Sequence, residues 1–117
     1  MNNFTGKRVL VVDDEPLITM MLEDILGDLG YIVVGPALDV GEAELLAREA
    51  EIDAAILDVH LGMETCHSIA RLLQERHIPF VVASGDDDAS AVPGSAGTLT
   101  KPLLPATVKA ALGSLIA

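Results

Sequence analysis

Short apolar runs that stop at a polar or charged residue recur along this chain of 117 residues. Val9 to Val12 run into two aspartates, and Ala54 to Leu57 run into a third, Asp58. Continuous apolar runs of this length are typical of strands that are buried on both faces of a parallel sheet. Five strands are therefore predicted, the last of them brief, over residues 9–12, 32–34, 54–57, 80–83 and 98–100.

The segments between the predicted strands have the composition and periodicity of helices. Pro16 suits the first turn of a helix, and Gly30 is expected to end it. Further helices are expected from about Val40 to Glu51, from roughly Glu64 to Arg76 and from Pro105 onward. The apolar face of the first helix is predicted to comprise Leu17, Met21, Leu22, Ile25, Leu26 and Leu29.

The order of these elements predicts the fold. Strand and helix alternate about five times, and right-handed crossovers then give a parallel sheet with helices on both faces. Gly35 and Pro36 are expected to close the second strand. Residues 86–97 hold three aspartates, a proline and two glycines, so a helix there would be short and weak. We predict a single domain over residues 1–117, with a doubly wound α/β fold, a flavodoxin-like strand order of 2-1-3-4-5 and a short or irregular fourth helix.

The charge and cysteine content exclude several classes of protein. Eighteen acidic residues stand against seven basic ones, which gives a formal net charge of −11. Nucleic acids and anionic membranes need a basic surface, so neither is expected as a partner. Cys66 is the single cysteine, which excludes an internal disulfide and predicts a buried or unreactive thiol. No apolar segment approaches the roughly 18 residues of a membrane span, and the cytoplasm is the expected location.

Polar groups follow the predicted strands at the edge where ligands of open α/β sheets bind. Asp13, Asp14 and Asp58 bring three carboxylates to this edge, and these repel one another unless a cation joins them. Mg²⁺ prefers such oxygen ligands and often binds beside phosphate groups. One carboxylate could then accept a phosphoryl group. Lys101 and the Ser84 hydroxyl, at the ends of two other strands, would stabilise the phosphoryl oxygens.

These motifs carry a resemblance to a known family. The chain is similar throughout its length to the receiver domains of two-component response regulators. The residues that match are Val11-Val12-Asp13-Asp14-Glu15-Pro16, Leu57-Asp58-Val59, Ser84-Gly85 and Lys101-Pro102. The resemblance implies that Asp58 accepts phosphate from the phosphohistidine of a histidine kinase. It also implies that Asp14 and Asp58, with the backbone carbonyl of His60, bind Mg²⁺, and that Asp13 supports this metal site.

The same resemblance implies that Lys101 is the partner of the phosphate and that Ser84 supplies the hydroxyl that moves on activation. Many receivers carry Tyr or Phe three residues before the lysine, where this chain has Thr98. The activation signal is therefore predicted to pass through the backbone between Ser84 and Thr98. Residues 78–85 resemble the "PFxFATGY" motif of a receiver subgroup found largely in alphaproteobacteria, with Asp86 in place of its tyrosine.

A phosphorylation switch without an output domain of its own is the function that these residues predict. Its output would pass through a partner protein, or the domain would act as a phosphate shuttle or sink; a receiver cut from a longer protein would look identical. No catalysis beyond its own phosphorylation and dephosphorylation is expected. The alternative is a receiver-like interaction module that is never phosphorylated, which the missing aromatic favours and the intact acidic set opposes. A phosphatase of the haloacid-dehalogenase type is disfavoured, because Asp58-Val59-His60 lacks the second aspartate of that motif.

Overall fold

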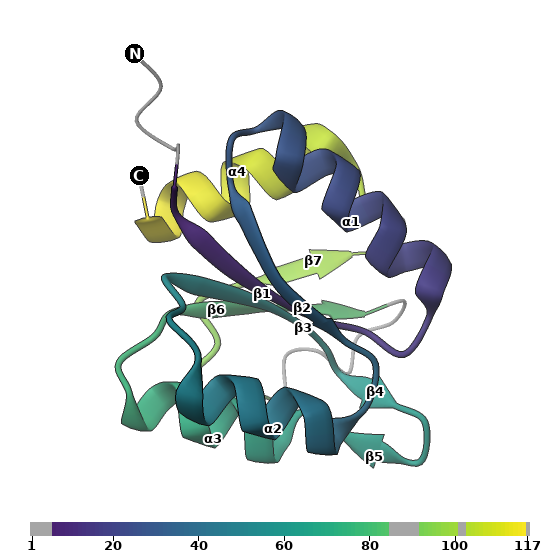
Figure 1. Ribbon diagram of the computed structural model, residues 1–117, viewed down its shortest axis with the longest axis vertical. Helices are drawn as coiled ribbons and strands as arrows, with labels where there is room; N and C mark the ends of the chain where they lie inside the picture. The colour runs from purple at the N-terminus through teal and green to yellow at the C-terminus, as the bar shows by residue number, and fades with distance from the viewer. Residues whose placement is uncertain (1–5, 85–91, 101–102, 117) are drawn as a thin grey trace.

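The computed structural model describes residues 6–84, 92–100 and 103–116, which form helical layers around a parallel sheet (Figure 1). The sheet strands are β1 Arg8–Val12, β2 Ile32–Ala37, β3 Ala54–Asp58, β6 Phe80–Ser84 and β7 Thr98–Thr100. The helices are α1 Pro16–Asp28, α2 Val40–Glu49, α3 His67–Glu75 and α4 Pro105–Ile116. Two short strands, β4 His60–Leu61 and β5 Glu64–Thr65, pair as a separate antiparallel hairpin.

The sheet has the strand order β2-β1-β3-β6-β7, and its pairings are parallel. When the five sheet strands are counted along the chain, this is the predicted order 2-1-3-4-5, so the flavodoxin-like fold is confirmed. Helices α1 and α4 cover one face of the sheet, and α2 and α3 cover the other (Figure 1). Within the described ranges, none of the helices has the length and hydropathy that a membrane span requires.

Each face of the sheet carries its own hydrophobic core, and the strands alternate between the two. Leu10 and Val12 of β1 pack into the core beneath α2 and α3, whereas Val9 and Val11 pack into the core beneath α1 and α4. The central strand β3 is buried along its whole length. Burial on both faces explains why these strands are continuous apolar runs in the sequence. Each fully buried Val, Leu or Ile side chain stabilises the fold by about 1.5–3 kcal/mol.

The second strand is longer than predicted, because β2 continues through Gly35 and Pro36 to Ala37. β2 lies at the edge of the sheet and pairs with β1. The register of this pairing shifts between Leu10 and Val12 of β1. A proline has no N–H to donate, and an edge strand with an irregular register tolerates that loss. The expected end at Gly35 and Pro36 was therefore wrong.

Two members of the predicted apolar face of α1 lie on the surface. Leu17 is 74% exposed and Met21 is 42% exposed. The residues that α1 packs against the sheet include Ile18, Leu22 and Ile25. Leu17 and Met21 each precede a core residue by one position, which turns them by about 100° around the helix axis. Helix α1 therefore presents apolar side chains to the surface as well as to the core.

Two further predictions concern the connections after β3 and β6. Helix α3 begins at His67 and not at Glu64, because Glu64 and Thr65 form β5. The short or irregular fourth helix was predicted within residues 86–97. Residues 92–97 are not helical, and residues 85–91 lie outside the described part of the chain. Most of the backbone between Ser84 and Thr98, which was predicted to carry the activation signal, also lies outside the described part of the chain. The helix labelled α4 in Figure 1 is the one that was predicted to begin at Pro105.

Candidate functional site

Adjacent strands bring three aspartates together at the carboxyl edge of the sheet. β1 and β3 pair in parallel with Val12 opposite Leu57, so Asp13 and Asp58 follow at the same level. One carboxylate oxygen from each of Asp13, Asp14 and Asp58 lies within 4.8 Å of the other two. The sequence predicted this convergence from the strand ends alone.

Backbone amides orient two of the three carboxylates. The Glu15 N–H donates to Asp13 Oδ1 at 2.9 Å, and the Gly62 N–H donates to Asp14 Oδ2 at 2.9 Å. Asp13 is also held by its own N–H, which donates to the Ala37 carbonyl oxygen at 3.1 Å. Asp13 and Asp14 are thus each oriented by a hydrogen bond from a backbone N–H to one carboxylate oxygen.

The cluster combines buried and exposed carboxylates. Asp13 is 2% exposed and Asp58 is 6% exposed, whereas Asp14 lies at the surface. Like charges this close destabilise one another, and burial strengthens the repulsion because less water screens it. A cation among them would offset the repulsion. The donors are all carboxylate oxygens, the ligand type that hard divalent ions such as Mg²⁺ prefer, so the residues present fit such an ion.

Of the other predicted site residues, the structure describes the backbone of Ser84 and the position of His60 but not Lys101. Ser84 ends β6, which pairs with β3 through Ala83 and Asp58, so its backbone lies at the same edge of the sheet as the carboxylates. Lys101 lies outside the described residues; it directly follows β7, whose last residue Thr100 pairs with Ser84. His60 is exposed and opens β4.

Sequence reasoning missed the β4–β5 hairpin that borders the carboxylates. His60 pairs with Thr65 and Leu61 pairs with Glu64, which leaves Gly62 and Met63 as a two-residue loop. Gly62 has φ 65°, a conformation that favours glycine at the start of such a loop. The signal in the sequence was this glycine between two short segments, and it is weak because neither segment has a clear alternation of apolar and polar residues.

The thiol of Cys66 lies close to Asp58. Cys66 precedes α3 and is fully buried, and its N–H donates to the Val59 carbonyl oxygen at 3.0 Å. Burial raises the pKa of the Cys66 thiol to about 11; a backbone hydrogen bond opposes this rise, and the charge of Asp58 adds to it. The prediction of a buried thiol is confirmed.

We expect the native protein to resist thiol-specific reagents at pH 8. The reagent must reach a buried sulfur, and with a pKa of about 11 roughly one thiol in a thousand is ionised at that pH. The measurement is the rate of reaction with a chromogenic disulfide, in buffer and in guanidinium chloride. The unfolded chain serves as the control and should react at once. Rapid stoichiometric reaction of the folded protein would contradict the placement of Cys66.

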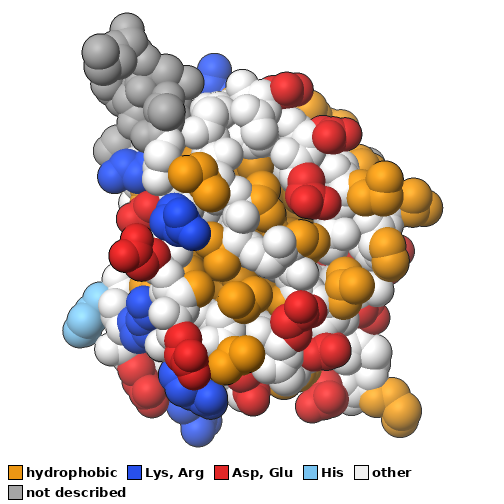
Figure 2. Space-filling model, viewed as in Figure 1, with side chains coloured by type: hydrophobic (Ala, Val, Ile, Leu, Met, Phe, Trp, Pro, Cys, Tyr) orange, Lys and Arg blue, Asp and Glu red, His pale blue; other side chains and the backbone are white. Residues whose placement is uncertain are grey.

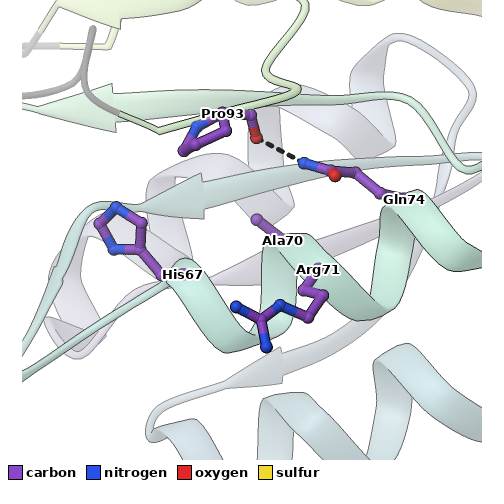
Figure 3. Close-up of a pocket in the computed structure, with 5 residues that line it drawn as sticks. All are labelled: His67, Ala70, Arg71, Gln74 and Pro93. Carbon is purple, nitrogen blue, oxygen red and sulfur yellow. Dashed lines mark hydrogen bonds between the residues drawn. The ribbon is translucent and has the colours of Figure 1, made fainter.

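A separate shallow pocket of about 150 Å³ lies between α3 and the segment before β7 (Figure 3). The Gln74 amide nitrogen donates to the Pro93 carbonyl oxygen across it. Gly94 has φ 84°, and a Cβ added there would lie 2.0 Å from Nε2 of Gln74. His67 and Arg71 line the pocket, but no member of the carboxylate cluster does. This pocket is therefore not part of the candidate site.

Acidic side chains are spread over the face of the molecule in Figure 2, with apolar side chains exposed between them. This distribution matches the formal net charge of −11. A surface of this charge repels polyanions, and the absence of a nucleic-acid partner stays a prediction.

Comparisons with known proteins agree with this geometry. Residues 9–113 match the family model of the response regulator receiver domain. The chain is 31% identical to the chemotaxis protein CheY of Thermotoga maritima, over 94% of this chain and 98% of that protein. It is 30% identical to the phyllosphere-induced regulator PhyR of Methylorubrum extorquens, over 93% of this chain but 43% of PhyR. One solved structure, the receiver domain of the sensor histidine kinase PA1611 from Pseudomonas aeruginosa PAO1, has magnesium coordinated in its active site cleft; the TM-score is 0.84 at 25% identity, over 95% of this chain and 98% of that one.

Proposed function

Because the chain belongs to the response regulator receiver family, we propose that it is a phosphorylation switch in which Asp58 accepts a phosphoryl group from a histidine kinase. The observation that carries the proposal is the position of Asp58. It ends the central buried strand, it is 6% exposed, and two further carboxylates lie within 4.8 Å of it. A carboxylate at this place can act as a nucleophile at the edge where α/β sheets bind their ligands.

The proposed reaction moves one phosphoryl group between two side chains. A carboxylate oxygen of Asp58 forms a bond to phosphorus, the bond from phosphorus to the imidazole nitrogen of the kinase breaks, and the histidine leaves. The Lys101 ammonium and the Ser84 hydroxyl are proposed to face two of the phosphoryl oxygens and to offset their charge. Transfer of the phosphoryl group from the kinase to water then takes two steps, formation of the acyl phosphate on Asp58 and its hydrolysis. The lifetime of the acyl phosphate sets the duration of the signal.

Asp14 and Asp58, with the backbone carbonyl of His60, are the proposed ligands of Mg²⁺, and Asp13 supports them. The ion supplies a positive charge that offsets the carboxylates and polarises phosphoryl oxygens when it is bound. The work of the chain is to hold the ligands. Asp13 is fixed from the adjacent backbone and Asp14 from the β4–β5 hairpin.

The output of the switch is proposed to pass through a partner protein, with a phosphate sink as the other outcome of the same chemistry. CheY has the length of this chain, whereas PhyR is more than twice as long. Some relatives are named protein-glutamate methylesterases, but the chain covers 25% of one such protein, and we propose no enzymatic activity on other substrates. We also propose that the chain is related to the "PFxFATGY" subgroup of receivers. This proposal is based on the matching residues Pro79, Phe80, Ala83 and Gly85.

Beryllofluoride tests the proposal, because it stands in for a phosphoryl group on aspartate. NMR spectra of the labelled protein are recorded alone, with Mg²⁺, and with Mg²⁺ and beryllofluoride. We expect the amides around Asp58 and Lys101 to shift in the last step, and Asp58→Asn to remove that shift. A spectrum of the wild-type protein that does not respond would favour the alternative function, an interaction module that is not phosphorylated.

A further inference from the structure

The two acidic residues that follow β1 are oriented in different ways. Asp13 is 2% exposed, and its Oδ1 accepts from the N–H of Glu15, two residues away. Asp14 is exposed, and its Oδ2 accepts from the N–H of Gly62, which is 48 residues away in the sequence and belongs to the β4–β5 hairpin. The orientation of Asp14 therefore depends on the position of the β4–β5 hairpin.

The hairpin fixes the direction of the Gly62 N–H. Gly62 has φ 65° and is the first residue of the two-residue loop between the paired residues Leu61 and Glu64. Leu61 is 5% exposed, so the hairpin is anchored in the core beneath α2 and α3. Past the hairpin, the N–H of Cys66 donates to the Val59 carbonyl oxygen, which closes the segment at its base.

We propose that the β4–β5 hairpin is a positioning element for the divalent cation site, and that the Gly62 N–H raises Mg²⁺ affinity by holding Asp14 in its ligand orientation. This inference rests on the Mg²⁺ site of the proposed function. An exposed carboxylate loses rotamer freedom when it binds a metal, and a hydrogen bond that is already present removes part of that cost. Carboxylate ligands of metals are characteristically held in this way by groups outside the coordination sphere.

Thermodynamic linkage gives the proposal a second consequence. If the hydrogen bond raises the affinity for Mg²⁺ by some factor, Mg²⁺ strengthens the hydrogen bond by the same factor. Addition of Mg²⁺ should therefore slow hydrogen exchange at the Gly62 amide. The opposite order, in which the metal must displace Gly62 from Asp14, would make exchange faster.

Three variants test the proposal through Mg²⁺ affinity, measured from amide shifts and from thermal melts without any phosphoryl donor. Gly62→Ala places a side chain at a positive φ and turns the N–H away from Asp14. Gly6→Ala is the matched control, because Gly6 also has a positive φ, at 90°, has no atom within 4 Å of an added Cβ, and precedes the opposite end of β1. Gly62→Asn is the conservative variant, since asparagine is a favoured residue at positive φ in hairpin turns.

We expect Gly62→Ala to bind Mg²⁺ about three- to tenfold more weakly, with Gly6→Ala unchanged and Gly62→Asn close to wild type. The positioning role would be overturned if Gly62→Ala and Gly6→Ala bound Mg²⁺ equally well, or if Mg²⁺ made hydrogen exchange at the Gly62 amide faster. Neither result would contradict the metal site itself. A wild-type protein that does not bind Mg²⁺ would overturn both the metal site and this inference. A variant that is only less stable is distinguished by its thermal melt without Mg²⁺, which reports the stability of the fold separately from the affinity for Mg²⁺.

Discussion

Asp58→Asn is expected to abolish phosphorylation by acetyl phosphate and by a cognate histidine kinase. Asparagine keeps the shape of the side chain, but its amide is a poor nucleophile and cannot form an acyl phosphate. The measurement is the intact mass of the protein after incubation with acetyl phosphate and Mg²⁺, where the wild type should gain one phosphoryl group. Removal of one charge from a crowded cluster should leave the melting temperature without Mg²⁺ unchanged or higher.

Asp53→Asn is the matched control for this experiment. Asp53 directly precedes β3, so it lies at the opposite end of the same strand, and its Oδ2 accepts from the Arg8 N–H at 2.7 Å. An asparagine at this position can still accept the hydrogen bond. The Asp53→Asn variant should therefore be phosphorylated like the wild type. Labelling of Asp58→Asn at wild-type levels would show that another residue accepts the phosphate.

Asp14→Ala is expected to remove most of the thermal stabilisation that Mg²⁺ gives to the protein, while the fold remains intact. The side chain is exposed, and its loss gives up the Gly62 hydrogen bond but relieves repulsion with Asp13 and Asp58. At a Mg²⁺ concentration of 100 times its dissociation constant, a bound ion stabilises a protein by about 2.7 kcal/mol, and this stabilisation should nearly vanish in the variant. Thermal melts with and without Mg²⁺ measure both parts of the expectation.

Asp24→Ala controls for the change in net charge, because Asp24 is an exposed acidic residue of α1 outside the carboxylate cluster. It should keep the full response to Mg²⁺. If Asp14→Ala melts lower than the wild type both with and without Mg²⁺, Asp14 has a structural role and the metal assignment loses its main exposed ligand.

Much of the fold could be predicted because burial on both faces leaves a simple trace in the sequence. The strands β1, β3 and β6 bury nearly all of their apolar side chains, so each is a continuous apolar run that stops at a polar residue. Parallel register then brings Asp13 and Asp58 together without further information. The proximity of the three carboxylates follows from the same few residues.

The departures from the predictions arise where tertiary context outweighs local pattern. β2 continues past Pro36 because it lies at an edge of the sheet, which the local sequence does not reveal. Leu17 and Met21 share helical spacing with the core residues of α1 but point away from the sheet. The β4–β5 hairpin depends on Leu61 entering the core and on Gly62 meeting Asp14, two contacts between parts of the chain that are distant in sequence. The role of Lys101 stays a prediction, since that residue lies outside the described part of the chain.

The contact between α3 and the segment before β7 has a consequence for how such chains diverge. Any side chain at position 94 would collide with the Gln74 amide, with the added Cβ 2.5 Å from Cδ and 3.0 Å from Cγ. Gln74 is exposed, so its side chain could swing aside, but it would then give up the hydrogen bond to the Pro93 carbonyl. The φ of 84° at Gly94 is the stronger barrier, because a residue with a Cβ is strained in that conformation whatever the space around it. A lineage that replaces this glycine is therefore expected to rebuild the turn before β7, and relatives that keep the turn are expected to keep the glycine.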